Sequence, residues 1–208
     1  MKLLKGHIFI AGMLFCVVLK AAAGSGVESA VASKKAKTKS ISSKASRILE
    51  NSAGLERQME IYKHAAANRE LAALAQMEHA RKLQDKARQA ASIKDSADDK
   101  IYRSQHAKAG ALEKSAAVLY GKACANFDKA ASNQAKGASL SKKLGKVEQH
   151  RNAEIDKTNL KLRGSEALRL AAEAGEAAAV AYDKAEDLGQ VALNSQMAAS
   201  WLEKLAER

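Results

Sequence analysis

The chain has 208 residues with 35 basic and 23 acidic side chains, no proline and only 4% aromatic residues. It contains 45 alanines, whereas Leu, Ile, Val and Phe supply only 30 of the 185 residues from position 24 onward. This composition argues against a β-sandwich or barrel, which needs turn residues, β-branched runs and aromatics. It also argues against a doubly wound sheet, since no Val/Ile-rich strand follows residue 23. An alanine-rich, charged, almost entirely helical chain remains.

Residues 1–23 have the three parts of a secretory signal peptide. Lys2 and Lys5 precede a 12-residue apolar run at 8–19, and three alanines at 21–23 offer a cleavage site. Twelve helical residues span about 18 Å, less than the roughly 30 Å of a bilayer core. We therefore expect a secreted or surface-associated product with no transmembrane span after cleavage; an uncleaved anchor is the alternative.

The segment 24–41 is expected to be flexible because it is rich in serine and lysine. Its densest positive charge comes from Lys34, Lys35, Lys37 and Lys39. In a secreted protein such a run is either a solvated tail or a contact for an anionic surface, namely lipid, glycan or an acidic protein. No aromatic residue interleaves it to stack on bases, so nucleic acid is not an expected partner.

A heptad repeat follows in the next segment. Met59, Ala66, Ala73, Ala80 and Ala87 recur every seven residues, and a second row lies three residues further along at Tyr62, Arg69, Gln76, Leu83 and Ala90. This spacing predicts a helix with a seam that packs against another helix. Alanine at the closest approach predicts small separations between helix axes.

A longer apolar stripe is predicted near the C-terminus. Its members alternate three- and four-residue spacing and are Leu170, Ala174, Ala177, Ala181, Leu188, Val191, Ser195, Ala198, Leu202 and Leu205. Acidic side chains occupy the opposite face of the same helical wheel. The pattern is typical of one amphipathic helix packed on one side.

With proline absent, glycines and polar caps must end the helices. We place breaks near 94–100, at Gly137 and at Gly164, which gives helices near 42–94, 97–136, 139–163 and 166–208. The predicted fold is all-α: an elongated antiparallel helical bundle or coiled coil of three to four helices over residues 42–208. A helix could continue through any single one of these breaks, so a long two-helix hairpin is the alternative.

The sequence offers no catalytic, cofactor-binding or metal-binding motif. No histidine pair has i, i+4 spacing, and no histidine follows a glutamate at i+3, so neither the di-iron nor the zinc-protease signature occurs. After signal cleavage Cys124 is the only cysteine, so it is either a small buried residue or the site of an intermolecular disulfide. Trp201, the sole tryptophan, either docks in the core or anchors a partner or membrane.

The combination of signal peptide, Ala/Lys/Glu-rich heptads and absent proline resembles the alanine-rich helical-bundle surface and secreted proteins of parasitic protists, trypanosomes in particular. That resemblance implies an elongated bundle that stands off a membrane and faces host or vector ligands. The sequence departs from it in having neither a hydrophobic C-terminal anchor tail nor a cysteine framework. No functional residue is carried over.

These observations favour a non-enzymatic, secreted or surface-associated interaction protein that binds a host or partner macromolecule or associates with itself. One alternative is a protein that lays amphipathic helices on a lipid surface. A second is a disordered stress-protective protein of the late-embryogenesis-abundant type, which the low Leu/Ile/Val/Phe content favours.

Overall fold

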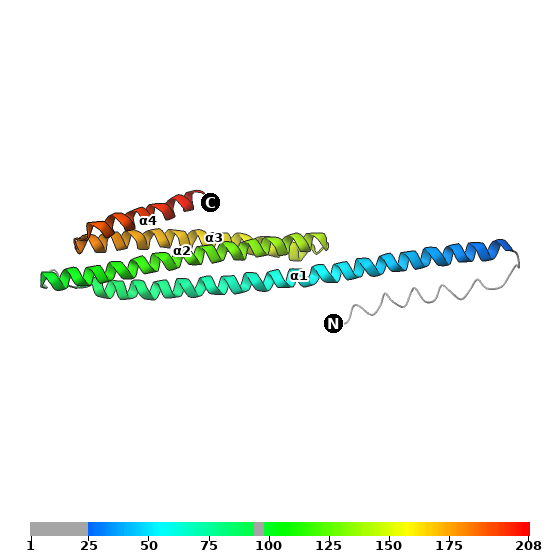
Figure 1. Ribbon diagram of the computed structural model, residues 1–208, viewed down its shortest axis with the longest axis horizontal. Helices are drawn as coiled ribbons and strands as arrows, with labels where there is room; N and C mark the ends of the chain where they lie inside the picture. Colours follow the sequence, from blue (N-terminus) through cyan, green and yellow to red (C-terminus); the bar gives the residue numbers. More distant parts are fainter. Residues whose placement is uncertain (1–24, 94–97) are drawn as a thin grey trace. The chain divides into compact units, whose positions relative to one another are not determined.

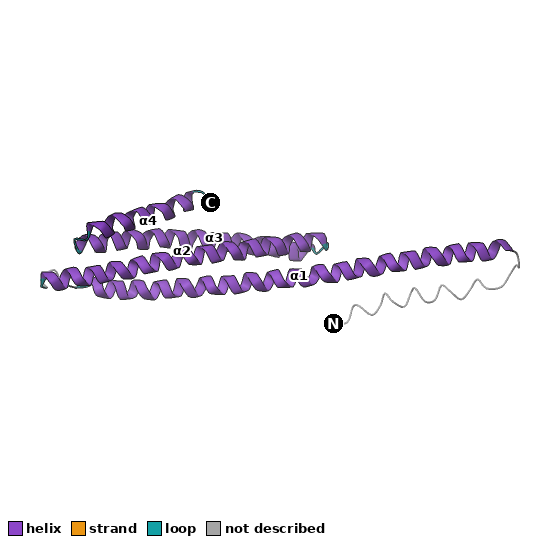
Figure 2. Ribbon diagram, in the orientation of Figure 1, coloured by secondary structure: helices purple, strands orange, loops and turns teal. Residues whose placement is uncertain are grey.

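The computed structural model describes residues 25–93 and 98–208, with side chains from residue 39 onward. In this part of the chain four helices follow one another: α1 (Ser25–Ala91), α2 (Asp99–Lys143), α3 (Val147–Lys184) and α4 (Leu188–Ala206), as Figures 1 and 2 show. The helices pack against each other, so the predicted all-α bundle is confirmed. The predicted signal peptide, residues 1–23, lies outside the described residues. The chain divides after Asn51, and the bundle described next comprises residues 52–208.

Three of the predicted helix boundaries are wrong. α1 begins at Ser25 rather than near 42, so the segment that we expected to be flexible is almost entirely helical. α2 continues through Gly137 to Lys143, and α3 continues through Gly164 to Lys184. A glycine within a helix weakens it by only about 1 kcal/mol relative to alanine, which packing against a neighbouring helix can offset.

The break predicted near 94–100 is confirmed, since it falls between α1 and α2, and the other two breaks lie at 144–146 and 185–187. Asp98 caps α2 because its Oδ1 accepts hydrogen bonds from the backbone N–H groups of Lys100 and Ile101, at 3.0 and 3.3 Å. Gly145 has φ of 69°, a left-handed conformation that glycine adopts without strain. Glu186 also has positive φ, at 59°, and Asp187 then caps α4 by accepting from Gln190 N–H.

The core of the bundle is the predicted alanine seam. Met59, Ala66, Ala73, Ala80 and Ala87 are all buried, and the last four are at most 1% exposed. Ala66, Ala73 and Ala80 pack against alanines of α2 and α3 around two large side chains of α2, Tyr120 and Phe127, whereas Ala87 packs with Ala109 and Ala181 in a second cluster. Because each alanine buries only one methyl group, these two rings contribute a large share of the apolar area in the core.

α4 packs on α2 and α3 where glycines leave room for it. A Cβ atom built on Gly121 of α2 would lie 2.6 Å from Cη2 of Trp201, and one on Gly175 of α3 would lie 3.1 Å from Cβ of Ala198. Figure 1 shows α4 running along the C-terminal part of α3. Gly175 therefore permits a close approach of α4 to α3, and Gly121 leaves room for the Trp201 ring on α2; neither glycine ends a helix.

The predicted C-terminal stripe does not form one buried face. The turn at 185–187 separates α3 from α4, and α4 packs back on α3 in a different register. Ala174, Ala181 and Ala198 are buried as expected. However, Ala177, Leu188, Ser195 and Leu202 are exposed, and Leu188 retains 73% of its accessible surface.

Candidate functional site

A polar network crosses the interface between α1 and α2. The hydroxyl of Tyr120 donates to Oε1 of Gln84 at 2.8 Å, and Nε2 of Gln84 donates to Oε2 of Glu113 at 3.2 Å. Tyr120 is 1% exposed and Glu113 is 8% exposed. Satisfying each group in this way is what allows a carboxyl and a phenol to lie inside an alanine-rich bundle.

A small groove of about 250 Å³ lies beside this network. Glu113 and the buried His106 come from α2, and the cations Arg88 and Lys184 come from α1 and α3. The remaining lining is apolar and comprises Ala87, Ala91, Ala109, Ala177, Val180 and Ala181. Among the described residues no three His, Cys, Asp or Glu side chains gather as metal ligands.

Burial raises the pKa of the Glu113 carboxyl, and the hydrogen bond from Gln84 and the charge of Arg88 oppose this rise only in part. The folded chain therefore holds this proton more tightly than the unfolded chain does. Stability from this group is fully present below the ordinary glutamate pKa and is lost as pH rises through the raised value. We expect Glu113→Gln to raise the melting temperature at pH 7.

The gain from Glu113→Gln should shrink toward pH 4, where the wild-type carboxyl is already neutral. Melting curves of both proteins between pH 4 and 8 would measure this. The exposed Glu148→Gln serves as a control for removing one negative charge. Equal shifts for both variants, or a loss of stability in Glu113→Gln at pH 7, would contradict the expected effect.

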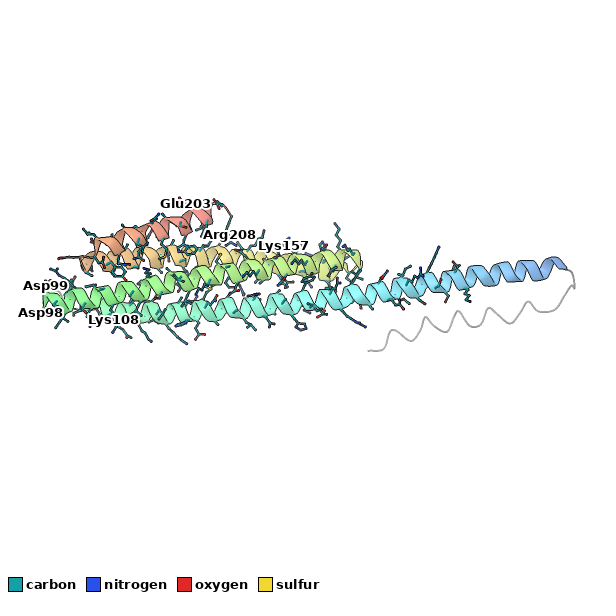
Figure 3. The ribbon with its side chains drawn as sticks, viewed as in Figure 1. Asp98, Asp99, Lys108, Lys157, Glu203 and Arg208 are labelled. Carbon is teal, nitrogen blue, oxygen red and sulfur yellow. The ribbon has the colours of Figure 1, made fainter. Side chains whose placement is uncertain are left out.

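Cys124 lies beneath the C-terminal residue. Its side chain is 5% exposed, its Sγ accepts from Nη1 of Arg208 at 2.7 Å, and Arg208 also pairs with Asp128. Figure 3 labels Arg208. Burial raises the pKa of the Cys124 thiol, and Asp128 adds to the rise while Arg208 opposes it. An intermolecular disulfide at Cys124 would therefore require the last turn of α4 to move.

We expect Cys124 to react slowly with maleimide in the folded protein, because the thiolate is disfavoured and covered. Arg208→Ala should accelerate the reaction. Loss of the arginine charge alone would raise the thiol pKa further and slow labelling, so faster labelling reports access to the sulfur. Peptide mapping separates Cys124 from Cys16. An unchanged rate in Arg208→Ala, beside rapid labelling in denaturant, would show that Arg208 does not cover the thiol.

The other predicted site residues are Trp201 and four lysines near the N-terminus. Trp201 is half-buried against the core, and Nζ of Lys204 lies 4.4 Å from its ring centroid. Lys39 is exposed on α1. The side chains of Lys34, Lys35 and Lys37 lie outside the described residues.

Sequence reasoning missed a second apolar face on α4. Residues 188–202 contain no charged side chain, although 28% of the whole chain is charged. Six residues of this helix, spaced alternately four and three apart, are all exposed. They form the α4 outer seam: Leu188, Ala192, Ser195, Ala199, Leu202 and Ala206. The signal that could have found this face is the uncharged run itself. A helix that buries only one side normally carries charged residues on the other side, so a run with no charge indicates two apolar sides.

Comparison of the chain with protein-family models, with curated proteins and with solved structures finds no match. Within the part that the structure describes, none of the helices combines the length and the apolar character needed to cross a bilayer.

Proposed function

We propose that this protein is a secreted or surface-associated helical interaction protein that binds a partner macromolecule or a second copy of itself and has no enzymatic role. Secretion rests on the charged, apolar and small-residue parts of residues 1–23. The buried alanine seams support a packed bundle over the disordered alternative.

The observation that carries the proposal is the α4 outer seam. Leu188 is 73% exposed, Leu202 is 45% exposed and the neighbouring Leu193 is 48% exposed. An uncharged helix face of this length in a highly charged protein is typical of a surface that a partner covers. A helix that only needed to pack on α2 and α3 would carry charges on its outer side.

Cross-linking of the protein in its own extracellular medium, followed by peptide mapping, tests this proposal. We expect cross-links near α4 that disappear in Leu188→Ser/Leu202→Ser. The matched control is Ile155→Ser/Leu162→Ser, which changes exposed apolar residues of α3 and should leave the cross-links intact. A product retained inside the cell, or a free monomer in its medium with no cross-link at α4, would overturn the proposal.

Binding to an anionic lipid surface is the second candidate. Ile41 and Ile48 are each 67% exposed on α1, next to the cations Lys39, Lys44 and Arg47. Lysine and arginine near an anionic membrane are each worth about 1 kcal/mol. Co-sedimentation with phosphatidylserine vesicles that Lys44→Glu/Arg47→Glu abolishes would support this candidate. Absence of co-sedimentation at low salt would dismiss it.

A further inference from the structure

The N-terminal part of α1 has an exposed seam of its own. Ile41, Ala45 and Ile48 are exposed and are spaced four and three residues apart; we call them the α1 N-terminal seam. The same alternation continues along α1 through Leu55 to Met59, where the buried seam of the bundle begins. The sequence therefore extends a helix-packing pattern into a stretch where the side chains remain exposed.

The two exposed seams lie in regions of opposite charge. Residues 25–51 carry six basic and two acidic side chains, whereas residues 165–208 carry four basic and eight acidic ones. On α3, the helix against which α4 packs, Glu176 and Asp183 are exposed, and so is Glu203 of α4, which Figure 3 labels on the side of α4 away from the other helices. An apolar seam with basic neighbours thus matches an apolar seam with acidic neighbours.

We propose that the α1 N-terminal seam of one molecule packs along the α4 outer seam of a second copy of this chain. This inference rests on the proposed function and names its partner. Both seams have the alternating four- and three-residue spacing that is typical of helices that pack side by side, so packing between them can use knobs-into-holes geometry.

Charge selects this pairing over the two symmetric ones. Two α1 N-terminal seams would bring together two segments with an excess of four positive charges each. Two α4 outer seams would bring together two copies of the 165–208 segment, each with an excess of four negative charges. Like charges across an interface are unfavourable, whereas the mixed pairing places lysines opposite carboxylates.

The mixed contact joins two different surfaces. It either occurs twice about a two-fold axis, so that each molecule of a dimer supplies both seams, or occurs head to tail and propagates into a ring or an open chain. α4 has 19 residues and is about 28 Å long, so one contact along it falls short of the roughly 1,200 Å² of a standard interface. We therefore expect weak, concentration-dependent association that a reciprocal pair of contacts strengthens.

Mixing two defective variants tests the pairing directly. Ile41→Ser/Ile48→Ser lacks the α1 seam, and Leu188→Ser/Leu202→Ser lacks the α4 seam. Analytical ultracentrifugation should show each variant as a monomer at concentrations where the wild type associates. An equimolar mixture should form heterodimers, because one intact α1 seam and one intact α4 seam remain. Circular dichroism checks that both variants stay helical.

Charge reversal provides a second readout. Lys44→Glu/Arg47→Glu and Glu176→Lys/Asp183→Lys should each weaken self-association, and mixing these two variants should restore it. Ile155→Ser/Leu162→Ser is the control that should associate like the wild type. The proposal is overturned if the α4-defective variant still self-associates, if the mixture of the two charge-reversed variants, which can form both contacts, remains monomeric, or if the wild type is monomeric at all accessible concentrations. In each case a cross-linked foreign partner at α4 would leave the proposed function standing.

Discussion

Replacing Phe127 by alanine is expected to lower the free energy of unfolding by about 3–5 kcal/mol, the range for removing a fully buried aromatic ring. Phe127 has no exposed surface and lies in the main core cluster with alanines of α1, α2 and α3. Alanine side chains are short and fixed to helix backbones, so they cannot move into the space that the ring leaves. A domain typically has only about 5–15 kcal/mol of stability, so this single change removes a large fraction.

Urea unfolding followed by circular dichroism measures the effect of Phe127→Ala. Val118→Ala on the same helix is the matched control, because Val118 is 38% exposed and its truncation should cost well under 1 kcal/mol. Similar losses in the two variants would contradict a core centred on Phe127. An unchanged slope with denaturant would show that the unfolding transition remains comparable.

Periodicity predicted the parts of the fold that depend on the spacing of small residues. The row from Met59 to Ala87 is buried because a seven-residue repeat keeps the same side of a helix against its neighbours. The same reasoning failed for Leu188 and Leu202, since a heptad pattern shows which residues share a face and not which face is covered. Because the uncharged run of α4 has no charged residue on either side of the helix, the sequence does not show which side is buried.

Helix ends were harder to predict because glycine has two uses in a helical protein. Gly145 has a left-handed φ and ends a helix, whereas Gly164 lies inside α3, where an added Cβ would approach Nη2 of Arg208 at 3.0 Å. Local sequence does not distinguish these uses, because the second depends on a residue far along the chain. Glu186 shows the opposite case, a turn made without glycine.

The candidate site was missed for the same reason. Gln84, Glu113 and Tyr120 lie on two helices and are brought together only by the register of α1 against α2. Cys124 and Arg208 are 84 residues apart in the sequence. Isolated polar residues on a helix indicate a network only when the facing helix is known, which the heptad pattern alone does not supply.

Gly121→Ala is expected to loosen α4 from α2. The new Cβ would lie 2.6 Å from Cη2 and 2.8 Å from Cζ2 of Trp201, closer than carbon atoms approach, so the indole ring must move. Overpacking typically costs about 1–3 kcal/mol, and the better helix propensity of alanine returns about 1 kcal/mol. A net loss of up to about 2 kcal/mol should remain. Trp201 is the sole tryptophan, so its emission should shift to the red as the ring becomes hydrated.

Gly137→Ala is the matched control because it makes the same change on the same helix. No atom lies within 4 Å of a Cβ built there, so only the gain in helix propensity applies, and stability should rise by about 1 kcal/mol with no change in emission. If Gly121→Ala lowers the stability and Gly137→Ala raises it, the result would show that the Trp201 ring of α4 packs in the space beside Gly121 on α2. A stabilising Gly121→Ala with unchanged emission would show instead that α4 does not pack closely on α2, and the outer seam of α4 would lose its defined orientation.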